Sequence, residues 1–311
     1  MQTYDTVIIG GGPAGCSAAI YASRASLTTL LVEQGIAGGQ IATTDMVENY
    51  PGISSISGAG LGEALEQHAR DAGAQIACDA VLELVRETDG TFALKLQDGA
   101  LHARSVIACL GATPRRAGFS GEETFRGRGV SYCATCDAMF FRNKRVFVIG
   151  GGNTACEDAL YLSRVAASVE VVLRRDAFRA PRGMVERMLA RDNITVRYQT
   201  SILEISGQVM PERIVFQDNV SGATYEETYP KGSFGVFVLV GSEPATGLVA
   251  PFVDLAPDGS VLTDESMATK TPGLYCAGDM RSKPLRQAIT AASDGAIAAN
   301  AAYHYVEERF W

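Results

Sequence analysis

Histidine, tryptophan and excess positive charge are scarce in this chain, and long apolar runs are missing. Its 311 residues include three histidines and one tryptophan, and the formal net charge is -8 with a pI near 5.0. An acidic chain lacks the basic surface that nucleic acid binding requires, so we expect no nucleic acid partner. No apolar run reaches the roughly 18 residues of a membrane span, and the first residues lack the basic-then-apolar pattern of a signal peptide. We therefore expect a cytoplasmic protein with no membrane partner.

Cysteine is too irregular in number and spacing for a secreted disulfide framework or a structural zinc site. The seven cysteines lie at positions 16, 78, 109, 133, 136, 156 and 276, mostly within apolar segments. An odd count of this kind is not typical of secreted, disulfide-stapled proteins. Zinc would need two further ligands beside Cys133 and Cys136, and His68, His102 and His304 are scattered, so we predict no metal site. The other five cysteines we interpret as small buried side chains.

Glycine, by contrast, is abundant, and part of it lies in two similar segments. The first runs from an apolar strand at 6–9 through Gly10-Gly11-Gly12-Pro13-Ala14-Gly15 to an alanine-rich helix at about 16–26 and a strand at 29–32. The second runs from a strand at 145–149 through Gly150-Gly151-Gly152-Asn153-Thr154-Ala155 to a helix that reaches about 165 and a strand at 169–173. A Gly-rich turn between a strand and a helix inside a βαβ unit is typical of dinucleotide binding.

Each position in such a turn has its own task. Gly10 makes the tight turn, Gly12 lets a pyrophosphate approach the backbone, and Gly15 brings helix and strand together. The pyrophosphate lies at the helix N-terminus, where free N–H groups and the helix dipole favour an anion. The alternative is a pair of glycine turns without ligands. We assign to nucleotide binding Gly10, Gly12, Pro13, Ala14 and Gly15 in the first segment and Gly150, Gly152, Asn153, Thr154 and Ala155 in the second.

The residues that follow the second strand of each segment predict different ligands. Glu33 ends the first segment, where a carboxylate accepts hydrogen bonds from a ribose diol, so this segment suits FAD or NAD. Arg174 and Arg175 end the second, and Arg179 follows. Guanidinium groups bind a 2′-phosphate as bidentate donors, which favours NADP(H) there. The alternative for these arginines is a solvated basic turn.

Cys133-Ala134-Thr135-Cys136 lies between the two segments and predicts a redox dithiol. CxxC spacing lowers thiol pKa values and suits a reversible disulfide, and cytosolic disulfides are more often catalytic than structural. Asp137 follows directly and is a candidate to relay protons as the disulfide opens. Its alternative role is a helix N-terminal cap.

Taken together, these motifs resemble the low-molecular-weight thioredoxin reductases, FAD-dependent members of the pyridine nucleotide-disulfide oxidoreductase family. Residues 129–137 are similar to that family's active-site stretch, and 150–155 with 174–180 to its NADPH signature. Residues 38–40 and 48–52 match its flavin-contacting loops, and 277–279 with 286–292 match the segment that closes its FAD site. The resemblance implies further FAD contacts, which are Gly39, Gln40, Asn49, Gly278, Asp279, Arg286, Gln287 and Ala288.

The resemblance implies an α/β fold of two Rossmann-like, doubly wound, three-layer domains. A discontinuous FAD domain of residues 1–115 and 248–311 would be interrupted by an NADPH domain, residues 116–247, that carries the CxxC pair. The family also implies a homodimer and a domain rotation with hinges in the two linkers.

The implied activity is that of an NADPH-dependent thioredoxin reductase. Electrons would pass from NADPH through FAD to the Cys133–Cys136 disulfide and on to a thioredoxin-like protein, with Cys136 facing the flavin and Cys133 attacking the partner. The alternatives are a ferredoxin-linked relative with a vestigial nicotinamide site, a flavin dithiol oxidase, and a flavin-binding module whose cysteines are idle.

A few positions depart from the family pattern. Leu173 replaces the usual histidine before the arginine pair, and Leu285 stands where tyrosine is common. The chain ends in Phe310-Trp311, which gives two hypotheses: an aromatic side chain that stacks over a flavin in this subunit or its partner, or a final helix at a dimer interface.

Overall fold

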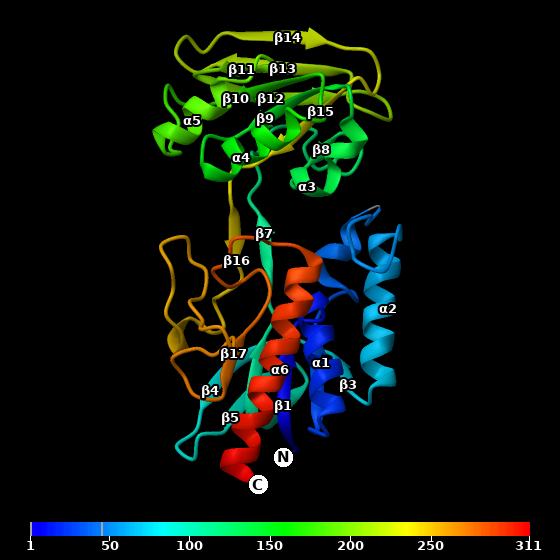
Figure 1. The fold of residues 1–311 in the computed structure, drawn as a ribbon, viewed down its shortest axis with the longest axis vertical. Coiled ribbons are helices and arrows are strands. Elements are labelled where there is room, and N and C mark those ends of the chain that lie inside the picture. The colour runs from blue at the N-terminus through cyan, green and yellow to red at the C-terminus, as the bar shows by residue number, and fades with distance from the viewer. Residues whose placement is uncertain (1, 45) are drawn as a thin grey trace. The chain divides into compact units, whose positions relative to one another are not determined.

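The computed structural model describes residues 2–44 and 46–311, and the chain forms two compact units. The first unit consists of Met1–Thr113 and Glu243–Trp311, and the second of Pro114–Ser242, so the second is inserted into the first (Figure 1). The sequence predicts borders after residue 115 and before residue 248. At the two crossings, β7 (Ala112–Pro114) and β16 (Ser242–Pro244) pair as a two-stranded sheet.

The first unit is built on a sheet of order β3-β2-β1-β6-β5-β4, with β17 also paired to β6. Strands β3, β2, β1, β6 and β17 are parallel, whereas β4 and β5 form an antiparallel extension of β6. The bounds are β1 Thr3–Ile9, α1 Pro13–Arg24, β2 Thr29–Glu33, η1 Gly39–Thr43, α2 Gly58–Asp71, β3 Gln75–Cys78, β4 Val81–Arg86, β5 Phe92–Leu96, β6 Gly99–Ala108, η3 Ala250–Phe252, β17 Leu274–Cys276 and α6 Ala288–Phe310.

Successive side chains along the parallel strands point to opposite faces of the sheet, so the first unit has two separate hydrophobic cores. Ile8, Leu31 and Ile107 face α1 and α6, which run side by side (Figure 1). Their neighbours Val7 and Leu30 point to the opposite face, where they pack with residues of β4, β5 and the segment after residue 248. Because both faces of the parallel sheet are covered, its strands read as nearly continuous apolar runs.

The second unit repeats this plan with the parallel order β11-β10-β9-β15-β8. An antiparallel sheet of order β12-β13-β14 accompanies it. The bounds are β8 Val130–Ser131, α3 Ala134–Asp137, η2 Ala138–Phe141, β9 Arg145–Ile149, α4 Asn153–Leu162, β10 Ser168–Val172, α5 Arg182–Leu189, β11 Ile194–Arg197, β12 Thr200–Ser206, β13 Arg213–Asp218, β14 Thr224–Thr228 and β15 Phe234–Val238.

The second unit is also three layers deep. Val146 and Val148 of β9 pack with the residues of α4 and α5, while Phe147 between them packs with Phe216 and Ile202 of the antiparallel sheet. Each unit therefore has a helical layer, a parallel sheet and a β layer. The predicted α/β class, with two nucleotide-binding-type folds and one inserted in the other, is confirmed.

Two local predictions need correction. The first helix begins at Pro13 rather than near residue 16, because proline suits the first helical position and Gly12 is the N-cap. Four of the five other cysteines are buried, but Cys78 is exposed because it ends β3, the edge strand of its sheet.

Within residues 2–44 and 46–311, no helix combines the length and apolar character needed to cross a membrane. The same residues contain no group of three or more histidine, cysteine, aspartate or glutamate side chains able to hold a metal ion.

Candidate redox and nucleotide-binding sites

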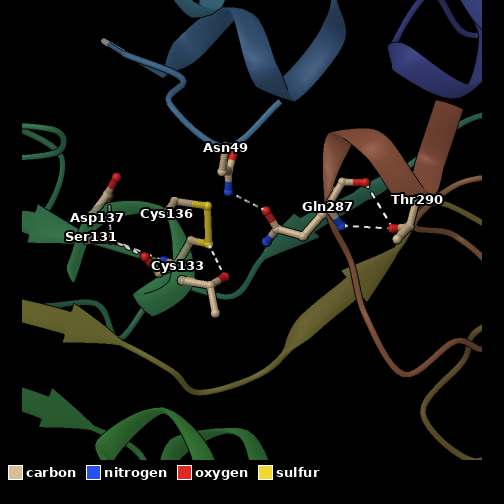
Figure 2. Close-up of a disulfide and its surroundings, with 8 residues drawn as sticks. Asn49, Ser131, Cys133, Cys136, Asp137, Gln287 and Thr290 are labelled. Atoms are coloured by element: carbon tan, nitrogen blue, oxygen red, sulfur yellow. Dashed lines mark hydrogen bonds between the residues drawn. A yellow bond between two sulfur atoms is a disulfide. The ribbon is translucent and has the colours of Figure 1, made fainter. Parts of the chain in front are cut away.

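The Cys133–Cys136 pair forms a disulfide at the start of a short helix in the second unit (Figure 2). Cys133 directly precedes α3 as its N-cap residue, and the two Cα atoms are 5.3 Å apart. Cys136 is exposed and Cys133 is half-buried. The accessible disulfide is suited to thiol exchange with another protein.

Polar side chains of the same segment lie next to this disulfide. Thr135 Oγ1 lies 3.4 Å from Cys133 Sγ, and the Cys133 N–H donates to Ser131 Oγ at 3.1 Å. Ser131 Oγ donates in turn to Asp137 Oδ2 at 2.6 Å. Asp137 is the N-cap residue of η2, where its side chain makes no capping hydrogen bond.

A buried carboxylate supports the residue before Cys133. The Tyr132 hydroxyl donates to Glu122 Oε1 at 2.7 Å, and Glu122 also accepts the N–H groups of Ala117 and Gly118. Glu122 is 4% exposed. Burial and the hydrogen bond to Glu122 raise the pKa of Tyr132 well above its ordinary value. Sequence reasoning missed Glu122, which lies outside every motif, and gave Ser131 no role although it lies within the 129–137 stretch.

The first glycine turn connects β1 to α1, and at two of its glycines there is no space for a side chain. A Cβ on Gly15 would lie 1.7 Å from the Gly10 carbonyl oxygen, and one on Gly10 would lie 2.4 Å from that of Cys109. Gly10 also has a φ of +105°, which favours glycine. A Cβ on Gly12 would meet only Gly38 O, at 3.8 Å, so the backbone there is open to a ligand.

Glu33 lies beside this turn, at the end of β2. Its Oε2 accepts the Gly11 N–H at 2.5 Å and its Oε1 accepts the Gly35 N–H at 2.6 Å. Each carboxylate oxygen has a further lone pair, so the side chain can still accept a hydroxyl hydrogen. The predicted contact with a ribose is compatible with this position.

Loops from distant parts of the first unit meet around Gly12 and the start of α6. Gly39 approaches Gly12, since a Cβ on Gly39 would be 3.4 Å from the Gly12 Cα, and Gln40 follows it in η1. Asn49 Nδ2 donates to Gln287 Oε1 at 3.0 Å (Figure 2). Gln287 is the N-cap of α6 and forms a capping box with Thr290.

The segment after β17 completes this part of the first unit. A Cβ on Gly278 would lie 3.0 Å from Ala14 Cβ, which brings the segment against the first turn of α1. Asp279 Oδ1 is buried and has no hydrogen-bond partner among the described residues. Burial raises the pKa of the Asp279 carboxyl, against the opposing charges of Lys283 and Arg286. The Arg286 side chain donates to the Asp279 carbonyl oxygen at 3.2 Å, and Ala288 begins α6.

A buried ion cluster that the sequence did not reveal holds this segment. Asp294, the seventh residue of α6, accepts the Gly278 N–H at 3.1 Å and pairs with Lys283 at 2.8 Å and Arg281 at 3.3 Å. Asp294 is 6% exposed, and the Lys283 side chain is 4% exposed. Lys283 Nζ also lies 3.8 Å from Asp279 Oδ1. The cluster joins residues whose spacing matches no motif.

In the second unit, a cavity of about 320 Å³ lies at the carboxyl ends of β9 and β10. Its lining includes Gly150, Arg174, Arg175 and Arg179 of the predicted nucleotide site, together with Gly151, Arg115, Arg116, Thr200 and Ser201. The predicted residues Gly152, Asn153, Thr154 and Ala155 follow at the start of α4. Arg115 and Arg116 were not predicted, because they come from the linker rather than from the βαβ motif.

Leu173, the departure from the family pattern, is part of the cavity wall. It is buried, and a Cβ on Gly151 would lie 2.2 Å from Leu173 Cδ1. The Gly151 carbonyl accepts the Arg179 N–H at 2.7 Å. The apolar replacement therefore packs under the turn, and the three arginines keep their places beside it.

The C-terminal aromatic residues lie at the opposite end of α6 from Gln287. The helix has 23 residues, or about 34 Å at 1.5 Å per residue. The Arg104 guanidinium lies over the Phe310 ring at 5.5 Å, and Trp311 is exposed and near Tyr303. Phe310 and Trp311 therefore lie far along the helix from Gln287, and both hypotheses about these aromatic residues stay predictions.

Comparisons with known proteins agree with these features. The model of the pyridine nucleotide-disulphide oxidoreductase family matches residues 4–295. The chain is 42% identical over 313 residues to a thioredoxin reductase of Peptoclostridium acidaminophilum, with 99% of each chain covered. It is 43% identical over 309 residues to one of Treponema pallidum, also with 99% of each covered. The crystal structure of thioredoxin reductase from Streptococcus pyogenes superposes with a TM-score of 0.92 at 38% identity, over 98% of this chain and 99% of that one.

Proposed function

Because the chain belongs to the pyridine nucleotide-disulphide oxidoreductase family, and within it to the thioredoxin reductases, we propose that it reduces a thioredoxin-like protein with electrons from NADPH. The electrons would reach the Cys133–Cys136 disulfide through FAD. The observation that carries this proposal is an accessible CxxC disulfide in a chain with two nucleotide-binding-type turns.

The first unit suits FAD. Gly12 leaves room for a pyrophosphate at the N-terminus of α1, and Glu33 can accept a ribose hydroxyl. Asp279 Oδ1 is a buried acceptor that a hydroxyl of the ligand would satisfy. The residues that would hold the dinucleotide are Gly10, Gly12, Pro13, Ala14, Gly15, Glu33, Gly39, Gln40, Asn49, Gly278, Asp279, Arg286, Gln287 and Ala288. Bound FAD would supply two-electron transfer between a nicotinamide and a disulfide.

The second unit suits NADPH rather than NADH. Arg174, Arg175 and Arg179 gather at one cavity beside the second glycine turn, where they can bind a 2′-phosphate as charge-assisted donors. Arg115 and Arg116 add positive charge to the same wall. A ferredoxin-linked enzyme or a dithiol oxidase would have little use for such a set, so we favour the NADPH-dependent reaction.

The partner would dock beside the disulfide. Met139 and Phe140 follow Asp137 closely in the sequence, and their side chains are 55% and 50% exposed. Exposed apolar side chains next to a reactive site are typical of protein docking surfaces. A thioredoxin-like disulfide that binds there can form a mixed disulfide with one of the two cysteines, which the second cysteine then resolves.

The test is NADPH-dependent reduction of a thioredoxin disulfide by the FAD-loaded protein. We expect turnover with NADPH, little with NADH, and none for Cys136→Ser, which keeps its flavin. Cys78→Ser, which removes the exposed cysteine outside the pair, is the control and should stay fully active. Unchanged turnover in Cys136→Ser would refute the proposal.

A further inference from the structure

A buried hydroxyl connects Cys133 to the acidic residue that follows the CxxC pair. Ser131 is 4% exposed and sits in β8, whose pairing with β15 fixes the backbone of residues 130–131. Its oxygen accepts the Cys133 N–H at 3.1 Å and lies 2.6 Å from Asp137 Oδ2. Figure 2 shows Ser131 and Asp137 beside each other on one flank of the disulfide loop.

The distances decide where the single hydroxyl proton of Ser131 points. The Cys133 carbonyl oxygen is 3.2 Å away, whereas Asp137 Oδ2 is 2.6 Å away, the short distance expected of a hydrogen bond to a carboxylate. Because a serine hydroxyl has one hydrogen and two lone pairs, donation to Asp137 is compatible with acceptance from Cys133. The Asp137 N–H also donates to the Cys133 carbonyl at 3.2 Å.

We propose that Ser131 is a positioning residue for proton transfer at the Cys133–Cys136 pair, acting through Asp137. The inference rests on the proposed function in that it takes the pair to open and close as a redox disulfide. Opening breaks the S–S bond with two electrons, and each sulfur then needs a proton to become a thiol. Asp137 in its acid form would give one proton to the sulfur that leaves as thiolate, and solvent would supply the other.

Ser131 serves this step by holding the Asp137 side chain in place. Its hydrogen bond ties one carboxyl oxygen of Asp137 to the buried strand β8, two residues before Cys133. A purely structural serine would affect stability but would not change the pH dependence of disulfide opening.

The test uses a phosphine reductant, tris(2-carboxyethyl)phosphine, on the full FAD-loaded chain without nucleotide or thioredoxin. The phosphine attacks one sulfur, the other leaves as thiolate, and water then converts the adduct to phosphine oxide and the second thiol. The rate of opening is followed between about pH 5 and pH 9, a range that spans ordinary carboxyl ionisation and the neutral region. Quenching, alkylation and mass spectrometry count the Cys133 and Cys136 thiols.

We expect Asp137→Asn to slow the opening of the disulfide. The variant should also lose the part of the pH–rate profile that depends on a carboxyl group. Ser131→Ala should slow opening about 10-fold, a part of the 10²–10⁴-fold that a general acid contributes. It should also weaken the carboxyl-dependent part of the pH–rate profile, because the acid is no longer held in place. Ser131→Thr keeps the hydroxyl and should restore the wild-type profile. The double variant Ser131→Ala/Asp137→Asn should be no slower than Asp137→Asn alone, since both act on one step.

Ser163→Ala is the matched control, because that serine donates to a backbone carbonyl in the same unit and lies outside the CxxC segment. Ser131→Cys, similar in size but a weak donor, replaces Ser131→Ala if the alanine variant fails to fold. The inference is overturned if Ser131→Ala keeps the wild-type rate and pH profile, if its effect multiplies with that of Asp137→Asn, or if Asp137→Asn is itself without effect. A wild-type protein that fails to reduce thioredoxin would refute the proposed function but leave these rates unchanged.

Discussion

At the scale of single residues, we propose that arginine side chains set the nucleotide preference. Arg175 lines the cavity beside Gly151, whereas Arg182 lies in α5, pairs with Glu186 and is absent from that lining. Loss of one charge-assisted hydrogen bond costs about 1.5–3 kcal/mol, or roughly 10- to 100-fold in affinity. Arg175→Ala should therefore raise the KM for NADPH by about that factor and leave NADH kinetics unchanged. Arg182→Ala is the control and should match wild type with both nucleotides; an equal loss with NADPH and NADH in Arg175→Ala would contradict the 2′-phosphate assignment.

Two exposed apolar side chains make a second residue-scale prediction. If Met139 and Phe140 contact the partner, replacing both by serine should raise the KM for thioredoxin about 10-fold or more, since burial of one large apolar side chain contributes roughly 1.5–3 kcal/mol. The rate of flavin reduction by NADPH should not change. Val220→Ser, at a position 71% exposed in the same unit, is the control. An unchanged KM for thioredoxin would place the docking surface elsewhere.

Single residues also show where sequence reasoning reaches its limit. Gly10, Glu33, Arg174 and the CxxC pair could be predicted as site residues because each belongs to a spacing with a known physical reason. Lys283 and Asp294 were not predicted because an ion pair between a loop and a helix depends on tertiary packing, which leaves no local pattern in the sequence. The two added arginines of the cavity, Arg115 and Arg116, escaped for the same reason.

Helix α6 must lie very close to α1, which gives a prediction at the scale of elements. A Cβ on Gly295 would lie 2.0 Å from the Ala14 carbonyl oxygen, and the surrounding helices are backed by the sheet. Gly295→Ala should push α6 away from the first turn of α1, lower the free energy of unfolding by about 1–3 kcal/mol and weaken FAD binding. Thermal unfolding and flavin content measure both effects.

Gly183→Ala in α5 is the matched control, because a Cβ there meets nothing within 4 Å. It should leave flavin content unchanged and stability equal or slightly higher, since alanine favours a helix over glycine. Full flavin content and an unchanged unfolding temperature in Gly295→Ala would show that the two helices can separate without harm.

The elements themselves were predicted best where the pattern is local. The strand at 145–149 has the bounds of β9, and the strand that ends at Glu33 is β2. The sheet of β12, β13 and β14 was not predicted, because its strands carry no ligand motif and pair across variable turns. The end of α4 at Leu162 rather than near residue 165 reflects the weak sequence signal of helix ends.

For the whole molecule, one chain contains two copies of the same three-layer plan, the second inserted in the first. Both parallel sheets place a glycine turn after their central strand, β1 in one unit and β9 in the other. In open α/β sheets ligands bind at the carboxyl ends of the strands, where these turns lie. The two units therefore give one chain a place for each of two nucleotides, as a reductase with a flavin and a nicotinamide requires. The cytoplasmic location and the homodimer stay predictions.

The most direct test of this electron path is an anaerobic titration of the FAD-loaded protein with NADPH, following flavin absorbance and then counting thiols. Flavin and disulfide each accept two electrons, so the wild type should take up about two equivalents of NADPH per subunit. Without the pair, in Cys133→Ser/Cys136→Ser, about one equivalent should suffice for the flavin alone. NADH should be ineffective at the same concentrations. A wild-type flavin that dithionite bleaches but NADPH does not, or a wild type that takes up no more than the double variant, would contradict the account.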